Sequence, residues 1–139
     1  MSVTVRSREI ARAAFGAVEA RAKEFARSPG KRDKYRGFAL AFPTLIHTSG
    51  LAQATAFAFA KGDEKLDVLD DLATTIQKAI HRSEAAANHP GRELQRIARE
   101  TEDVMEYLRL SRVALQCATW IKRYSEALLK TGDADDSTK

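Results

Sequence analysis

An uncharged stretch of 23 residues, Phe38 to Ala60, constrains the fold of this chain more than any other feature. It holds no Asp, Glu, Lys or Arg, and charged runs flank it at Lys31 to Arg36 and at Lys61 to Lys65. A membrane-spanning helix needs about 20 continuous apolar residues, but Pro43 and the polar run His47 to Gly50 interrupt this stretch. The pattern therefore predicts two short apolar helices joined by a polar turn, at the centre of a soluble all-α fold with no membrane partner.

The composition predicts a single helical domain. A chain of 139 residues with 44% apolar residues has the length of one domain and can bury a core. Its single cysteine, Cys117, excludes an internal disulfide and is typical of a reducing cytoplasm, and the N-terminus lacks the apolar core of an export signal. We expect residues 1–130 to form a bundle of about five to seven helices and the polar residues 131–139 to be a disordered tail.

Apolar residues that recur at spacings of three and four mark the helices. The first predicted helix covers residues 7–27, the second begins at Asp33, and the third covers Leu51 to Ala60. The fourth is capped by Asp63, the fifth begins at Pro90, and the last runs from about Arg112 to Lys130. Residues 28–32 are predicted as a turn, and Pro43 should kink or end the second helix because it lacks an N–H. Gly50 suits a left-handed break. The spacing leaves open whether residues 94–128 form one, two or three helices.

Residues suited to catalysis or metal binding do not cluster in the sequence. His81 and His89 span a predicted helix end, and one cysteine is too few for a thiolate zinc site. We therefore predict no catalytic residue, metal, cofactor or small-molecule substrate. One spacing suggests an alternative: Arg82 and His89 form an Arg-x6-His pattern that resembles the active-site motif of HEPN-type ribonucleases, although Ser83 replaces the Asn, Asp or His preferred there. The alternative function is an HEPN-like helical ribonuclease that uses Arg82 and His89.

Basic residues concentrate in the first 36 residues, which hold ten Lys/Arg against four Asp/Glu. Dense cations attract phosphates by releasing counterions, without reading sequence. The candidate RNA-binding residues are Arg8, Arg12, Lys23, Arg27, Lys31, Arg32, Lys34 and Arg36, with Lys122 and Arg123 as a second patch. Tyr35, among these cations, has two interpretations. It stacks on a base, or it packs inward while Lys34 and Arg36 are solvated.

A strip on the last predicted helix is a candidate partner interface. Leu115, Ala118 and Leu129 lie away from the core face of that helix, and Leu51 to Ala60 is apolar nearly all round. Together they offer more hydrophobic surface than a small bundle needs. Alternatively, the loop after Arg82 or the fifth helix covers both surfaces internally.

Two segments share their order and spacing of residues with one known family. In the first segment the matching positions are Tyr35-Arg36, Pro43, Ile46, Gly50-Leu51, Gln53, Ala54 and Phe57 through Lys61. In the second they are Tyr107, Ser111, Ala114-Leu115, Trp120 through Tyr124, and Ala127. Together they resemble the small helical subunit of the type III-B CRISPR RNA-targeting complex, the Cmr complex. One departure is Ser49, where the family usually has Asn.

The resemblance implies a non-catalytic, cytoplasmic protein of antiviral defence. Members of the family stack head to tail into a short filament beside the backbone subunits that hold the guide RNA, and those backbone subunits cleave RNA. The implied partners are the other subunits of the complex, copies of this chain, guide RNA and target RNA. A basic face suits an RNA duplex, which is held through its backbone and shape.

Overall fold

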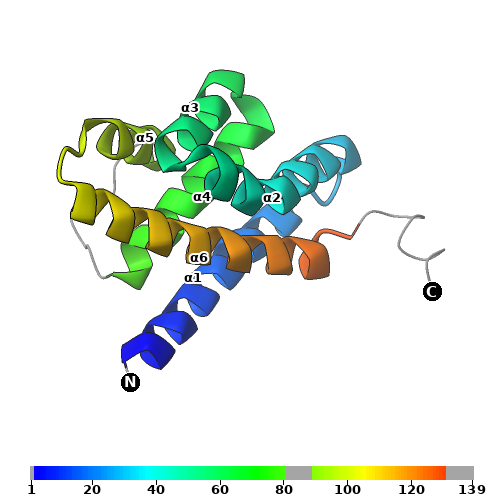
Figure 1. Ribbon diagram of the computed structural model, residues 1–139. Helices are drawn as coiled ribbons and strands as arrows, with labels where there is room; N and C mark the ends of the chain where they lie inside the picture. Colours follow the sequence, from blue (N-terminus) through cyan, green and yellow to red (C-terminus); the bar gives the residue numbers. More distant parts are fainter. Residues whose placement is uncertain (1, 81–88, 131–139) are drawn as a thin grey trace.

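Six helices make up the computed structural model, which describes residues 2–80 and 89–130. They are α1 (Ser2–Glu24), α2 (Pro29–Ser49), α3 (Leu51–Lys61), α4 (Asp63–Ala79), α5 (Pro90–Glu100) and α6 (Val104–Leu128), as Figure 1 shows. No strand occurs in these two ranges, and the predicted all-α bundle of five to seven helices is confirmed. The predicted tail, residues 131–139, lies outside the described residues. Within the described ranges, no helix combines the length and the hydropathy that a membrane span requires.

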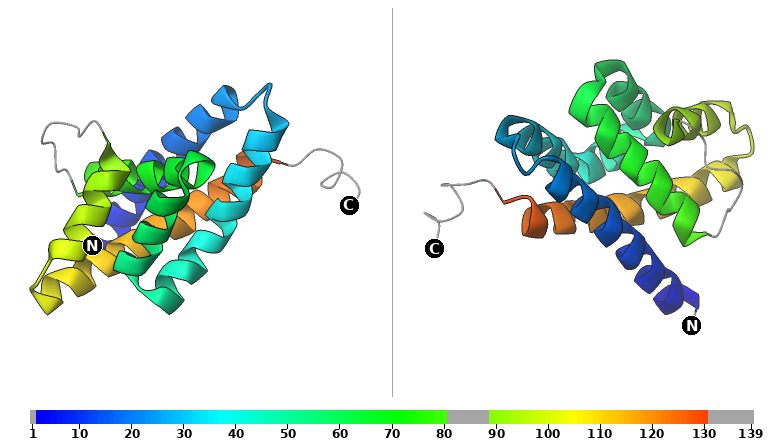
Figure 2. Two further views of the ribbon diagram at one scale, coloured as in Figure 1. Left: turned by 90° about the horizontal axis from the view of Figure 1, so that it is seen from above. Right: turned by 180° about the vertical axis from the view of Figure 1, so that it is seen from behind.

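Helix α4 lies at the centre of the bundle and contacts each of the other five helices. Val68, Leu69, Leu72 and Ile76 share one broad face of this helix, and all four are buried. The long helices α1 and α6 cross each other (Figures 1 and 2); both pack against α4, and α6 also packs against α2. The core therefore draws on all six helices, and it buries aromatic side chains such as Phe25 and Phe42 almost completely.

The central hairpin forms as predicted, with α2 and α3 joined at Gly50. This glycine has a φ of 89°, a conformation that side chains rarely adopt, so the break falls where the sequence places it. Pro43 does not end α2, because the helix continues to Ser49. Pro43 is itself buried, as are Phe42 and Ile46 on the same helix, and the packing of this face outweighs the backbone hydrogen bond that a proline loses.

Two helix starts differ from the prediction. Helix α2 begins at Pro29 instead of Asp33, because proline suits the first helical position, where its missing N–H costs nothing. The Asp33 carboxylate accepts from Arg32 instead of capping the helix. At α4, Gly62 occupies the N-cap and Asp63 is the first helical residue, so the predicted cap is shifted by one position.

The stretch left open in the sequence forms two helices. Helix α5 begins at Pro90 as predicted and ends at Glu100, and the chain turns over residues 101–103. Asp103 then caps α6: its side chain accepts from the backbone N–H groups of Met105 (2.9 Å) and Glu106 (3.3 Å). The predicted start of the last helix near Arg112 is wrong, since the helix begins at Val104 and passes through Ser111 without a break.

Candidate functional site

A buried polar cluster fixes the end of the molecule where α1 meets α2. Arg21 of α1 donates to both carboxylate oxygens of Asp71 on α4, at 2.9 and 3.1 Å. The hydroxyl of Tyr35 on α2 donates to the same carboxylate, and Asp67 lies 3.8 Å from the Arg21 guanidinium. Three helices are thereby joined at one point. Tyr35 is fully buried, so the interpretation in which it packs inward is confirmed and base stacking by Tyr35 is excluded.

The cluster shifts the titration of its members. Burial raises the pKa of the Asp71 carboxyl, against the opposing effect of the hydrogen bonds from Arg21 and Tyr35. Burial, with the charge of Asp71, also raises the pKa of Tyr35 well above its usual value. Burial lowers the pKa of Arg21, but the hydrogen bond and the charge of Asp71 outweigh this effect and raise it overall. Arg21 therefore stays charged, with a structural role that withdraws it from binding a phosphate.

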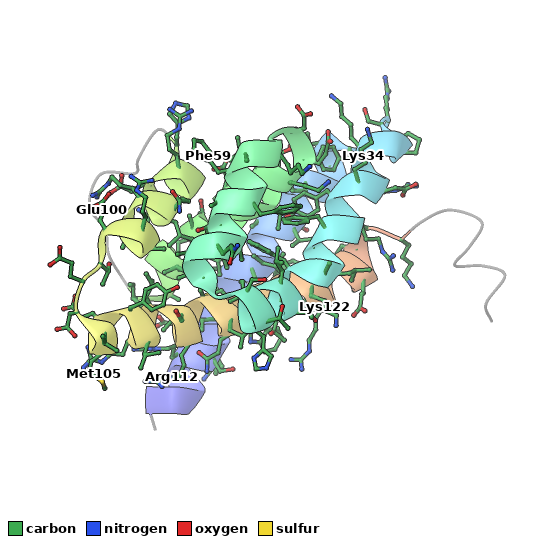
Figure 3. All side chains as sticks on the ribbon, turned by 45° about the horizontal axis from the view of Figure 1, so that its top comes forward. Lys34, Phe59, Glu100, Met105, Arg112 and Lys122 are labelled. Carbon is green, nitrogen blue, oxygen red and sulfur yellow. The ribbon has the colours of Figure 1, made fainter. Side chains whose placement is uncertain are left out.

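Four exposed cations surround this anchored connection, and we call them the basic end: Lys23, Arg27, Lys31 and Lys34. None of the four forms an ion pair with another described residue, whereas Arg32, half-buried beside them, pairs with Asp33 at 3.2 Å. Figure 3 shows Lys34 extending away from the body of the protein. Because the helices beneath are fixed, the four charges form a stable positive surface.

The other candidate RNA-binding residues do not all join the basic end. Arg8 and Arg12 are exposed, but they lie on the N-terminal half of α1, which runs away from the α1–α2 connection (Figures 1 and 2). Arg36 is half-buried. Lys122 is half-buried and Arg123 is exposed, with its guanidinium 5.2 Å from the centre of the Trp120 ring. In both figures the C-terminal end of α6 lies at the same end of the molecule as the α1–α2 connection.

The predicted partner strip on α6 is not a surface. Ala118 and Leu129 are 2% and 0% exposed, so the prediction is wrong for these two residues. Leu115 is half-buried and packs against the core. Helices α1, α2 and α4 all contact α6, whereas the fifth predicted helix, α5, packs on α3, the other apolar surface. The loop after Arg82, the other predicted cover, lies outside the described residues. A helix packed on several sides buries more than one apolar strip.

Exposed apolar side chains occur instead at the start of α6. Val104, Met105 and Leu108 are all exposed, Met105 by 55%. Exposed carboxylates surround them at Glu102, Asp103 and Glu106. We call this group of six the acidic corner. It lies at the opposite end of the molecule from the basic end (Figures 1 and 2), and Figure 3 labels Met105 there. Val104 and Leu108 belong to none of the surfaces predicted from the sequence, because their spacing fits a buried helical face equally well.

Helix α3 also exposes apolar rings. Only Leu51, Ala54, Thr55 and Ala58 are buried on it, so the alternative in which other segments cover this helix completely is wrong. Phe57 and Phe59 are 41% and 39% exposed. Each ring makes a cation–π contact. The Lys61 ammonium lies 5.5 Å from the centre of the Phe57 ring, and the Arg92 guanidinium lies 5.5 Å from the centre of the Phe59 ring.

The residues considered for catalysis do not form a described site. His47 is exposed near the end of α2, and His89 is exposed at the N-cap of α5. His81 and Arg82 lie outside the described residues. Burial raises the pKa of the Cys117 thiol to about 12, so this buried thiol is not a nucleophile at neutral pH. Among residues 2–80 and 89–130 no group of three or more His, Cys, Asp or Glu could hold a metal ion.

Comparison with known families decides the assignment. Residues 6–128 match the model of the family described as CRISPR-associated protein (Cas_Cmr5). The chain belongs to the Cmr5 family. A relative described as CRISPR system Cmr subunit Cmr5, from Thermus thermophilus, is 38% identical over 109 residues, which are 78% of this chain and 85% of that protein.

A solved Cmr5 structure has the same fold. The crystal structure of a CRISPR-associated Cmr5 family protein from Thermus thermophilus aligns with a TM-score of 0.71 at 35% identity. The alignment covers 88% of this chain and 96% of that one. The family resemblance drawn from the two sequence segments and the all-α fold are both confirmed.

Proposed function

We propose that this chain is the non-catalytic small subunit of a type III-B CRISPR ribonucleoprotein that acts in antiviral defence in the cytoplasm. The observation that carries the proposal is the Cmr5 family match, which extends over residues 6–128, nearly the whole chain. The relative from Thermus thermophilus is described as a Cmr subunit. The partners are then the other Cmr subunits, further copies of this chain, and the guide and target RNAs.

The basic end is the proposed contact with RNA. Its four cations are exposed and without ion pairs among the described residues, so their charge is available to phosphates. The Arg21–Asp71–Tyr35 cluster fixes the helices that carry them. A guide–target duplex is recognised through its backbone and shape, and counterion release by a fixed group of cations supplies affinity without selecting a sequence. Arg32, Arg36, Lys122 and Arg123 extend this proposed surface, and Arg8 and Arg12 lie beyond it.

The acidic corner is the proposed contact between subunits. Val104, Met105 and Leu108 are apolar groups that water would otherwise surround, and burying them against a neighbour stabilises an assembly. The acidic corner and the basic end lie at opposite ends of the molecule (Figure 1). A contact that uses two different surfaces of each copy is heterologous and builds an open filament. The acidic corner thus replaces Leu115, Ala118 and Leu129 as the proposed partner interface.

Counting the copies in a reconstituted complex tests the proposal. The other Cmr subunits and a guide RNA are combined with either the unmodified chain or a Met105→Glu/Leu108→Glu variant, and native mass spectrometry gives the copy number. We expect fewer copies with the variant, because two carboxylates would have to be buried at the contact. Phe57→Glu on α3 is the matched control and should leave the number unchanged. An equal copy number in all three samples contradicts the proposed contact.

The ribonuclease alternative gives a different result. If the chain is HEPN-like, the purified protein cleaves RNA, and an Arg82→Ala/His89→Ala variant does not. If it is the small subunit, neither protein cleaves RNA, and RNA is retained in a salt-sensitive manner when the partner subunits are present.

A further inference from the structure

A cavity of about 330 Å³ lies between α3 and α5, and none of its lining residues belongs to the basic end or the acidic corner. Phe59 of α3 forms one wall, and Figure 3 labels it beside α5. The other lining residues all come from α5: Arg92, Glu93, Gln95, Arg96 and Arg99. Positions 92, 96 and 99 share one face of a helix. Arg96 pairs with Glu93 and Arg99 pairs with Glu100 (3.0 Å), so the cavity retains the unpaired charge of Arg92 and a net positive charge.

Hydrogen bonds hold the arginines in place before any ligand binds. Arg99 donates from Nη1 to Oε1 of Gln95 (2.7 Å). Gln95 is 5% exposed, and its Nε2 donates to the carbonyl of Ala52 in the first turn of α3 (3.4 Å). Arg96 donates to the carboxylate of Glu93 through two nitrogens. A binding site whose side chains are already oriented loses less entropy when its ligand arrives.

The start of α5 is fixed as well. The backbone N–H of Gly91 donates to the Asp70 carboxylate of α4 at 2.8 Å. Arg92, the next residue, forms no ion pair with a described residue, and its guanidinium lies over the Phe59 ring. The cavity thus combines a partly exposed pair of planar groups with two further guanidinium groups along α5.

We propose that this cavity binds an unpaired nucleotide of a single-stranded nucleic acid. The base stacks on the Phe59–Arg92 pair, since bases stack both on aromatic rings and on guanidinium planes. The phosphate accepts hydrogen bonds from Nη1 of Arg96 and Nη2 of Arg99, the nitrogens that their bonds to Glu93, Glu100 and Gln95 leave free. The cavity volume falls at the lower end of the range for small-ligand sites, about 300–1,000 Å³. The inference does not depend on the proposed duplex contact, which uses other helices.

An acidic peptide is the competing ligand, and the geometry favours the nucleotide over it. The carboxylates of a peptide also pair with guanidinium groups, but Asp and Glu side chains have no flat surface to cover a phenyl ring that is 39% exposed. A nucleobase covers the ring and places a negative phosphate beside it. Exposed aromatic rings flanked by cations are typical of proteins that bind single strands.

Fluorescence anisotropy with the full-length chain tests the assignment. The probes are fluorescein-labelled RNA and DNA single strands of about eight nucleotides, an RNA duplex, and an oligoglutamate peptide. Phe59→Leu should raise the Kd for single strands about five-fold or more, because stacking on the ring is lost. Phe57→Leu is the matched control, since Phe57 is equally exposed on the same helix and lies outside the cavity, and it should leave the Kd unchanged.

Two arginine variants separate stacking from charge. Arg92→Lys keeps the positive charge but lacks the planar guanidinium group that stacks on the base. The affinity for single strands should therefore fall, while its salt dependence stays constant. Arg99→Ala removes a residue that contacts the phosphate, so it should reduce the salt slope by about 0.7, the value for one phosphate contact to a single strand. Both variants change a surface side chain, so the fold is expected to persist, which circular dichroism checks.

Several results would overturn the assignment. They are an absence of single-strand binding by the unmodified chain, an equal effect of Phe57→Leu and Phe59→Leu, and Phe59-dependent binding of the peptide alone. RNA and DNA single strands that bind alike support a site for any unpaired nucleotide. Alanine substitutions at the basic end should abolish duplex binding and leave single-strand binding unchanged. The duplex contact and the nucleotide site can therefore be tested, and can fail, independently of each other.

Discussion

Replacing Gly91 by alanine tests how closely α5 packs on α4. A Cβ atom at this position would lie 2.5 Å from Oδ1 of Asp70, 2.9 Å from Cγ of Leu69 and 3.0 Å from the backbone nitrogen of Asp70. The backbone nitrogen of α4 cannot turn aside as a flexible side chain can. Asp70 is also engaged, because it accepts the hydrogen bond from the Gly91 N–H at 2.8 Å. Alanine therefore requires α5 to move away from α4.

The expected cost is about 1–3 kcal/mol, the range for overpacking a well-packed interior. Helix propensity acts in the opposite direction, since alanine is favoured over glycine in a helix by about 1 kcal/mol, but it is smaller than the cost of moving a packed helix. Urea unfolding followed by circular dichroism measures the free energy of unfolding. The slope against urea concentration should stay constant if only stability changes.

Gly37→Ala is the matched control. Gly37 lies inside α2 and is exposed, and a Cβ atom added there would meet no other atom within 4 Å. Alanine there should raise the free energy of unfolding by about 0.5–1 kcal/mol. The two substitutions are chemically identical and should have opposite signs. A neutral or stabilising effect of Gly91→Ala would refute the close packing of α5 on α4, and with it the fixed position of the arginine cavity.

Three further predictions concern the polar cluster, the basic end and the buried thiol. Asp71→Ala should cost about 1–3 kcal/mol, because it leaves the Tyr35 hydroxyl buried without its acceptor, whereas Arg21 keeps Glu24 (2.9 Å) and Asp67 as partners; Asp33→Ala, at an exposed ion pair, should cost less than about 1 kcal/mol in the same unfolding assay. Alanine at all four positions of the basic end should lower the salt slope of duplex RNA binding by up to about 3.6, and an unchanged slope would remove this surface from the proposal. Iodoacetamide at neutral pH should label Cys117 only after unfolding, as followed by mass spectrometry, because burial raises the pKa of the thiol to about 12; rapid labelling of the folded chain would contradict its burial.

The candidate sites were predictable only in part. The excess of cations near the N-terminus is visible in the sequence, and four of those cations form the basic end. The sequence could not show that Arg21, one of the same group, is withdrawn into a buried cluster, because its partner Asp71 lies 50 residues away. Nor could it show the arginine cavity, because Phe59 and the three arginines belong to different helices and only the packing of α3 on α5 brings them together.

The sequence by itself determined which residues are helical and where most of the chain turns. The apolar spacings, Gly50 and Pro90 are local signals, and local sterics and hydrogen bonds act on them directly. Tertiary structure decided which faces are covered. A helical period tells which side chains share a face, but not how many neighbours pack on it. Hence Tyr35 and Leu129 are buried, Phe57, Phe59 and Met105 are exposed, and α2 continues through Pro43 because its packed face contributes more than one lost hydrogen bond.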